Sequence, residues 1–165
     1  MEPYKLRRWR RGSSPDRVAL FSCARPGRSH GKNGSVPDAV VHKWIKGLPG
    51  GDATAVVSLL GEKPDGTSEF SFYSFAGAKD VESHRRRGPS FEQWLTKHHA
   101  DRNIVLAEHP TTDFRPIEDE ALEAIGRDIE RLLNAEKTVV VVDSGGETRT
   151  GVVLRKLGFV EDPRA

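Results

Sequence analysis

The side chains best suited to chemistry are gathered in one segment, residues 139–151, which reads VVVVDSGGETRTG. The apolar run 139–142 predicts a buried strand, and the Gly145–Gly146 pair predicts a tight turn into a helix. Successive backbone N–H groups in such a turn point inward, and a helix N-terminus carries about half a positive charge. The segment therefore predicts an oxyanion site at a strand-to-helix junction.

Two side chains extend this prediction. Arg149 stands where the turn closes into the helix, so its guanidinium can grip a bound oxyanion with two parallel hydrogen bonds. The hydroxyl of Thr150 can reach back to Asp143, which opens the turn. We expect an anion cradle with Arg149 as its principal ligand, formed by Ser144, Gly145, Gly146, Glu147, Thr148 and Arg149. The alternative is an ordinary turn, with Arg149 on a solvated face.

The segment resembles the signature loop of the protein-tyrosine and dual-specificity phosphatases, His-Cys-x-x-Gly-x-x-Arg-Ser/Thr-Gly. The matching residues are Gly146, Arg149, Thr150 and Gly151. In that family the general acid is an aspartate on a loop some thirty residues before the cysteine. Here Asp113, in HPTTDFRPI, lies 30 positions before Asp143. The resemblance covers roughly residues 17–157 and implies a phosphatase-like fold, in which Asp113 would be a vestigial acid.

Two residues of the loop depart from the family. Val142 stands at the histidine, and Asp143 stands at the cysteine whose thiolate attacks phosphorus. A carboxylate about 4 Å from a phosphate charge is repelled by roughly 4 kcal/mol at an effective dielectric near 20. Asp143 would either block the pocket by pairing with Arg149 or orient Arg149 and Thr150. We expect a catalytically impaired, pseudophosphatase-like domain that binds a phosphorylated protein or a small anionic phosphate ligand.

Other readings of the same residues remain open. Asp143 could be a nucleophile, as in haloacid-dehalogenase phosphatases, but their second aspartate falls at Gly145. An active hydrolase could instead use an activated water. The segment also resembles the first phosphate loop of actin-like sugar kinases. In those kinases a long domain follows the loop, whereas here few residues follow it. The stretch after Cys23 resembles the low-molecular-weight phosphatase loop, but its spacing to Arg28 is one residue short, and we expect Cys23 to be a strand-end residue.

The elements that must position these residues alternate along the chain. Apolar runs predict strands at 17–23, 53–60, 103–107 and 138–142, and an alternating segment at 69–75 predicts a hairpin or edge strand. Helical spacing predicts helices at 36–48, 90–99, 117–133 and 149–157. We expect an α/β fold with a mostly parallel central sheet flanked by helices. Because 15 residues follow Thr150, we also expect a shortened C-terminus.

Composition limits the class of protein. A chain of 165 residues fits one domain, and its single cysteine, Cys23, excludes an internal disulfide framework and a multi-cysteine zinc site. No apolar run reaches the roughly 18 residues of a membrane span, and the first residues are too basic for a secretory signal. We expect a cytoplasmic protein with no membrane partner, no cofactor and no metal.

Basic side chains are concentrated at the N-terminus. Residues 1–32 carry nine lysines and arginines against two acidic residues. We expect residues 1–16 to form a basic arm and residues 17–165 to form a single phosphatase-like domain. The arm could bind nucleic acid or another polyanion, with Trp9 stacking on a base. The alternative is a poorly ordered, solvated N-terminus.

Overall fold

The computed structural model describes residues 3–12, 14, 17–28, 38–61, 95 and 103–163. Within them six strands form one sheet, in the order β4-β3-β5-β2-β1-β6. The strands are β1 (Arg7–Arg11), β2 (Arg17–Ala24), β3 (Thr54–Ser58), β4 (Val105–Glu108), β5 (Thr138–Asp143) and β6 (Phe159–Asp162). The helices are α1 (Asp38–Lys46), the short 3-10 helix η2 (Gly51–Ala53), α4 (Asp119–Asn134) and α5 (Thr148–Lys156).

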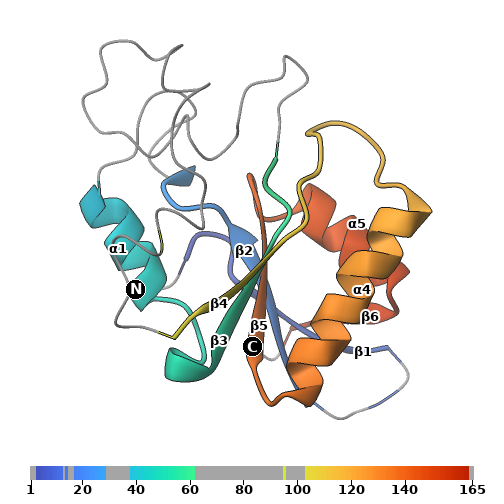
Figure 1. Ribbon diagram of the computed structural model, residues 1–165, viewed down its shortest axis with the longest axis horizontal. Helices are drawn as coiled ribbons and strands as arrows, with labels where there is room; N and C mark the ends of the chain where they lie inside the picture. The colour runs from blue at the N-terminus through green and yellow to red at the C-terminus, as the bar shows by residue number, and fades with distance from the viewer. Residues whose placement is uncertain are drawn as a thin grey trace.

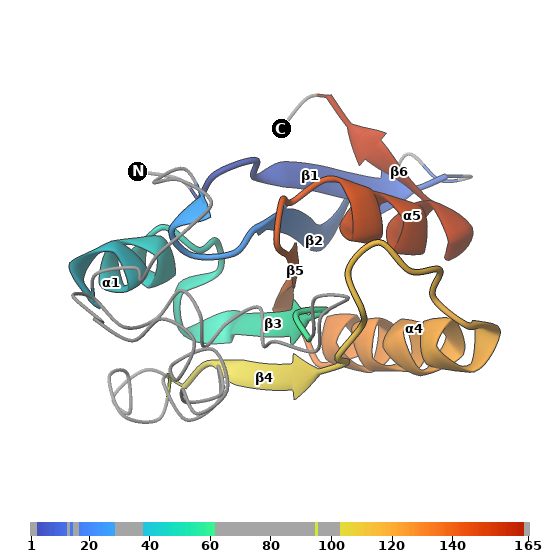
Figure 2. The ribbon, with the colours of Figure 1, turned by 90° about the horizontal axis from the view of Figure 1, so that it is seen from above.

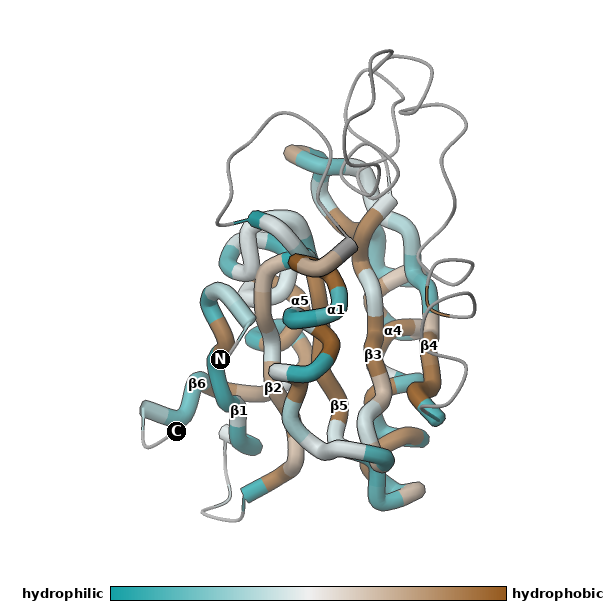
Figure 3. The backbone as a smooth tube through the Cα atoms, turned by 90° about the vertical axis from the view of Figure 1, so that its left-hand side faces the viewer, coloured by the Kyte–Doolittle hydropathy of each residue, from teal (hydrophilic) through white to brown (hydrophobic). Residues whose placement is uncertain are grey.

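The sheet is mostly parallel, as the sequence predicts. Strand β5 lies between β2 and β3 and is parallel to both, and β4 extends this parallel set beyond β3. Strand β1 is antiparallel to both of its neighbours, β2 and β6. The central strands β3 and β5 are largely apolar, whereas β1 is largely hydrophilic (Figure 3). The carboxyl ends of β2, β3 and β5 therefore meet at one edge of the sheet (Figure 1).

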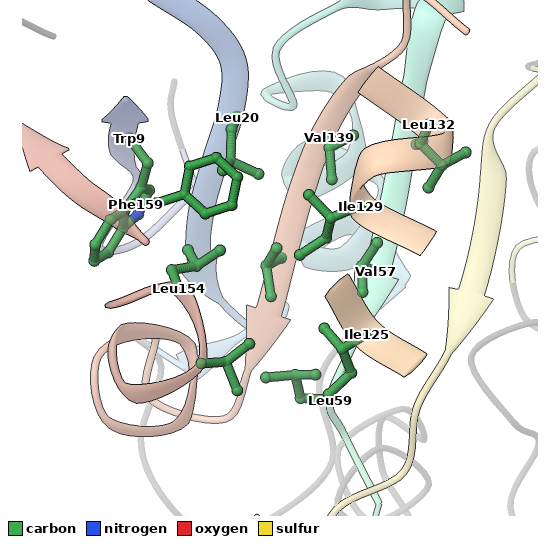
Figure 4. Close-up of a cluster of buried hydrophobic side chains, with 13 residues drawn as sticks. Trp9, Leu20, Val57, Leu59, Ile125, Ile129, Leu132, Val139, Leu154 and Phe159 are labelled. Atoms are coloured by element: carbon green, nitrogen blue, oxygen red, sulfur yellow. The ribbon is translucent and has the colours of Figure 1, made fainter. Parts of the chain in front are cut away.

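Helices cover both faces of the sheet: α1 lies on one, and α4 and α5 lie on the other (Figure 2). Alternate residues of β5 therefore enter different cores. Val140 and Val142 pack in a cluster with Trp44 and Ile45 of α1. The intervening valines of β5 pack with α4 and α5 in a second cluster (Figure 4). This burial on both faces explains the unbroken valine run, because all four valines of the strand are buried.

Most of the predicted elements are confirmed. The strands predicted at 17–23, 53–60, 103–107 and 138–142 correspond to β2, β3, β4 and β5. The helices predicted at 36–48, 117–133 and 149–157 correspond to α1, α4 and α5. The segment 69–75 lies outside the described residues, and of the helix predicted at 90–99 only Leu95 is described. Among the described residues, no helix has both the length and the apolar character needed to cross a membrane.

The N-terminal region differs from the prediction. The expectation of a solvated basic arm over residues 1–16 is wrong for Arg7–Arg11, which form β1 inside the sheet. Trp9 is 0% exposed, and its indole N–H donates to Ser22 Oγ at 2.8 Å. The burial of the Trp9 side chain and the pairing of β1 with both β2 and β6 hold this segment in the sheet. Strand β6 was also not predicted.

Candidate functional site

The predicted anion loop lies where β5 ends and α5 begins, at the carboxyl edge of the parallel strands. It packs directly against the end of β2. Gly146 has a φ of 77°, and a Cβ atom at that position would lie 2.5 Å from the backbone nitrogen of Ala24. Only glycine allows both this left-handed conformation and this close approach. The second glycine of the motif is therefore required by the turn geometry and by the contact with β2.

The carboxylate of Asp143 is turned into the loop that it opens. The residue is 2% exposed, its Oδ1 accepts a hydrogen bond from the Gly146 N–H, and its Oδ2 accepts one from the Thr150 N–H at 2.9 Å. A carboxylate is favoured here because the first N–H groups of a helix lack intrahelical partners and carry partial positive charge. The negative charge at the start of α5 is thus supplied by the chain itself.

Arg149 is bound by residues 109–117, the loop that carries Asp113 and is called the acid loop below. Its Nη2 is 3.5 Å from Asp113 Oδ1, and its Nη1 donates to Thr111 Oγ1 at 3.0 Å. The hydroxyl of Thr111 in turn donates to the carbonyl oxygen of Leu59, at 2.6 Å. Arg149 is 6% exposed, so these contacts hold a largely buried cation. Asp113 and Arg149, 36 positions apart in the sequence, face each other across this contact.

The structure thus brings Asp113, Asp143, Arg149 and Thr150 to one edge of the sheet, but two contacts differ from those considered in the sequence. Thr150 reaches Asp143 through its backbone N–H, and not through its hydroxyl. Arg149 pairs with Asp113, while Asp143 binds backbone amides. In both cases the Asp143 carboxylate accepts hydrogen bonds from backbone N–H groups of the turn and of α5.

The cradle residues surround the same turn. Ser144 and Gly145 are partly exposed, and Glu147 and Thr148 are exposed. Within the described part of the chain, the backbone N–H groups of these four residues have no protein acceptor. Donors of this kind at a helix N-terminus are suited to an external oxyanion. The loop is therefore partly filled by Asp143 and partly open.

Two basic residues that sequence reasoning did not assign to the site also reach the loop. Arg7 Nη2 donates to the carbonyl oxygen of Gly146 at 2.9 Å and approaches Thr150 Oγ1 at 3.4 Å. Lys5 Nζ lies 3.0 Å from Glu147 Oε1, and this hydrogen bond and charge pairing raise the pKa of Lys5 and lower that of Glu147. The only signal in the sequence was the excess of basic residues. Such an excess does not say how β1 aligns with the strands beside it.

The acid loop is anchored to α4 by His109. The backbone N–H of His109 donates to the carbonyl oxygen of Ser58 at 2.8 Å, and its Nε2 lies 2.6 Å from Asp128 Oδ2. Arg131 binds the other carboxylate oxygen at 3.0 Å. Burial alone would raise the pKa of Asp128, but the hydrogen bonds from His109 and Arg131 outweigh it and lower that pKa.

Cys23 is a buried strand residue, paired in register with Val142. Burial, and to a lesser extent the charge of Asp143, raise the pKa of its thiol far above the usual range. The thiol is therefore protonated near neutral pH, which makes it a poor nucleophile. Among the described residues, no group of three or more histidine, cysteine, aspartate or glutamate side chains is arranged to hold a metal ion.

Comparison with known proteins gives a match in structure but not in sequence. No family model and no curated protein matches the chain. Kinase associated phosphatase, in a form whose catalytic cysteine is replaced by serine, superposes with a TM-score of 0.57 and 14% identity over 95% of this chain and 74% of that chain. The chain therefore has a phosphatase fold like that of kinase associated phosphatase.

Two structures of Tk-PTP are also similar. A mutant form gives a TM-score of 0.49 and 19% identity over 84% of this chain, and the active form gives 0.45 and 22% over 84%. The chain spans 64% and 65% of the length of the chains in those two structures.

Proposed function

We propose that this phosphatase-fold chain is a catalytically impaired domain, which binds a phosphorylated protein or a small phosphate ligand at residues 144–149 without turning it over. One observation carries the proposal: both oxygens of Asp143 accept backbone N–H groups, from Gly146 and Thr150. The resemblance to the phosphatase loop puts the nucleophilic thiolate at this position. A carboxylate that is 2% exposed and hydrogen-bonded at both oxygens is poorly placed to attack phosphorus.

The neighbouring charges also disfavour turnover. Asp113, the counterpart of the general acid, lies 3.5 Å from Arg149 and engages the cation that would otherwise grip phosphate. An incoming phosphate must share Arg149 with Asp113 and tolerate the charge of Asp143. Both costs fall on the transition state as well as on the bound ligand, so we expect weak binding and no acceleration.

Binding is supported by the open side of the loop. The amides of Ser144, Gly145, Glu147 and Thr148 are free of protein acceptors in the described region, and they lie at the positive end of α5. A phosphate monoester could therefore approach from solvent without displacing Asp143. We expect such a ligand to contact these amides first and Arg149 second.

The test combines turnover with binding. Wild-type protein should not hydrolyse an aryl phosphate above the buffer rate, yet inorganic phosphate should shift the amide NMR signals of Ser144 and Gly145 in a saturable way. Asp143→Cys, compared with Asp143→Ser as the control that lacks a thiolate, should form a covalent phosphoenzyme with the aryl phosphate. If the wild type turns over substrate and loses that activity on Asp143→Ser, the chain is instead a hydrolase that uses Asp143 or an activated water.

A further inference from the structure

Two arginines from different elements stack on one buried indole. The guanidinium carbon of Arg7, in β1, lies 5.1 Å from the centre of the Trp9 ring, and that of Arg155, in α5, lies 5.4 Å from it. Trp9 is 0% exposed, so the ring is held rigidly by the core beneath it. Stacking on an indole fixes the plane of a guanidinium group, and in this position Arg7 Nη2 donates to the carbonyl oxygen of Gly146.

Both guanidinium groups also border the same point on α5. A Cβ atom built on Gly151 would lie 2.7 Å from Arg155 Nη1 and 3.8 Å from Arg7 Nη2. Any larger side chain at position 151 would thus push Arg155 away from its place beside Arg7. The glycine allows the two cations to come together on the β1-facing side of the helix.

The charges at this point are not balanced within the described part of the chain. Arg7 Nη1 has a carboxylate neighbour, Glu161 Oε2, at 3.5 Å. Arg155 is exposed, and among the described residues its guanidinium group has no hydrogen bond or ion pair and lies over the Trp9 ring. Two guanidinium groups held side by side repel each other, and an added anion relieves this repulsion.

We propose that Arg7 and Arg155 form a second anion site, which takes a phosphate-type oxyanion group between their guanidinium donors. Planar guanidinium groups bind such oxyanions through pairs of parallel hydrogen bonds. The site does not depend on anion binding at residues 144–149. It is joined to that loop, however, because Arg7 also donates to the carbonyl oxygen of Gly146.

The test is a titration of the full, ¹⁵N-labelled chain with inorganic phosphate at constant ionic strength. We expect saturable shifts of the Trp9 indole N–H and the Gly151 amide. Arg155→Gln should weaken this binding by about tenfold or more, because it removes half of the donor set. The matched control is Lys156→Gln, which removes an adjacent charge from the same helix and should leave the affinity unchanged within about twofold.

The possible results separate the two proposals. Saturable shifts at Ser144 and Gly145 without shifts at Trp9 and Gly151 overturn the second site and support the loop; the reverse pattern supports the second site alone. Equal affinities for Arg155→Gln and Lys156→Gln also overturn it. If Arg155→Gln does not fold, Arg155→Lys replaces it. Lysine keeps the charge but loses the two-armed donor, so binding should weaken several-fold, and unchanged affinity contradicts the proposal.

Discussion

Asp143 favours folding of the turn, and in the proposed function the same contacts disfavour catalysis. Its carboxylate satisfies two amides at the start of α5 and supplies the charge that the helix terminus favours. The same two bonds engage the oxygens that an attack on phosphorus would need. A thiolate could accept the same N–H groups and remain a strong nucleophile, because sulfur is large, polarisable and weakly hydrated. Under the proposed function, aspartate in place of the thiolate would keep the turn and remove the nucleophile.

The motif spacing predicted which residues of the loop come together but not which partners they choose. The sequence suggested that Arg149 pairs with Asp143, whereas it pairs with Asp113, because Asp143 is bound by backbone amides. The contacts of Arg7 and Lys5 could not be foreseen, since they depend on the register of β1 against β2. The sequence does not distinguish a basic side chain that faces water from one that binds a carbonyl oxygen of the loop.

The two glycines of the turn should respond differently to substitution. Gly146→Ala should lower the free energy of unfolding by about 2 kcal/mol or more, because it adds a Cβ against the β2 backbone at a left-handed φ. At Gly145 no atom lies within 4 Å of such a Cβ, so Gly145→Ala should leave stability nearly unchanged. Urea unfolding of both variants measures the difference. Equal losses would contradict the close packing of the turn against Ala24.

At the scale of elements, the acid loop is positioned by a helix that does not carry the chemistry. His109 and Asp128 join the loop to the middle of α4, while Thr111 joins it to the end of β3. Helix α4 is itself fixed by Ile125, Ile129 and Leu132, which are buried on one face. Asp113 therefore faces Arg149 because of contacts made elsewhere on the same loop.

The pH dependence of stability should reveal this anchor. The pKa of Asp128 is lowered from 3.8, so its ion pairs stabilise the fold above about that pH and are lost as the pH falls through the lowered value. Asp128→Asn should cost about 1 kcal/mol near pH 6 and much less near pH 2.5. Urea unfolding at both pH values tests this, with Glu123→Gln on the same helix as the control. A loss that is the same at both pH values would show that the carboxylate charge is not involved.

The elements that the sequence predicted are those with a clear periodic pattern. Strand β5 and helix α4 carry an unbroken valine run and a one-faced apolar stripe, and both were found within a few residues of their true bounds. Strand β1 reads RRWRR, so its single buried residue is surrounded by arginines. Three of these arginines lie over aromatic rings, as Arg8 does over Phe21, and no local sequence pattern predicts such packing.

At the scale of the whole molecule, the sheet has a parallel part, which the sequence predicted, and an antiparallel edge formed by β1 and β6, which it did not. The parallel strands β4, β3, β5 and β2 place the loop and the acid at one edge. The antiparallel pair β1 and β6 brings Arg7 and Glu161 beside α5. The antiparallel edge depends on the pairing of β1 with β6, two short strands far apart in the sequence. Local sequence patterns do not predict such pairing.

The position of β1 in the sheet determines how polyanion binding by the basic N-terminus can be tested. Removing residues 1–12 would also remove β1, so a loss of binding would not separate charge from folding. Arg10→Gln is a better probe, because it takes one charge from the strand and leaves Trp9 in place. If the basic residues do bind a polyanion, the affinity of this variant should fall less steeply with salt than that of the wild type.

The position of Trp9 makes the N-terminal strand part of the folding unit. Trp9→Ala should lower the free energy of unfolding by about 3–5 kcal/mol, because it leaves a large cavity between β1, α5 and β6. Trp9→Phe keeps most of the apolar contact but loses the hydrogen bond to Ser22, so its cost should be clearly smaller. Thermal and urea unfolding of the full chain compare the two variants. If the Trp9→Ala protein were as stable as the wild type, β1 would not contribute to the core. The Trp9 ring would then not hold Arg7 in the position where it binds Gly146 and lies near Arg155.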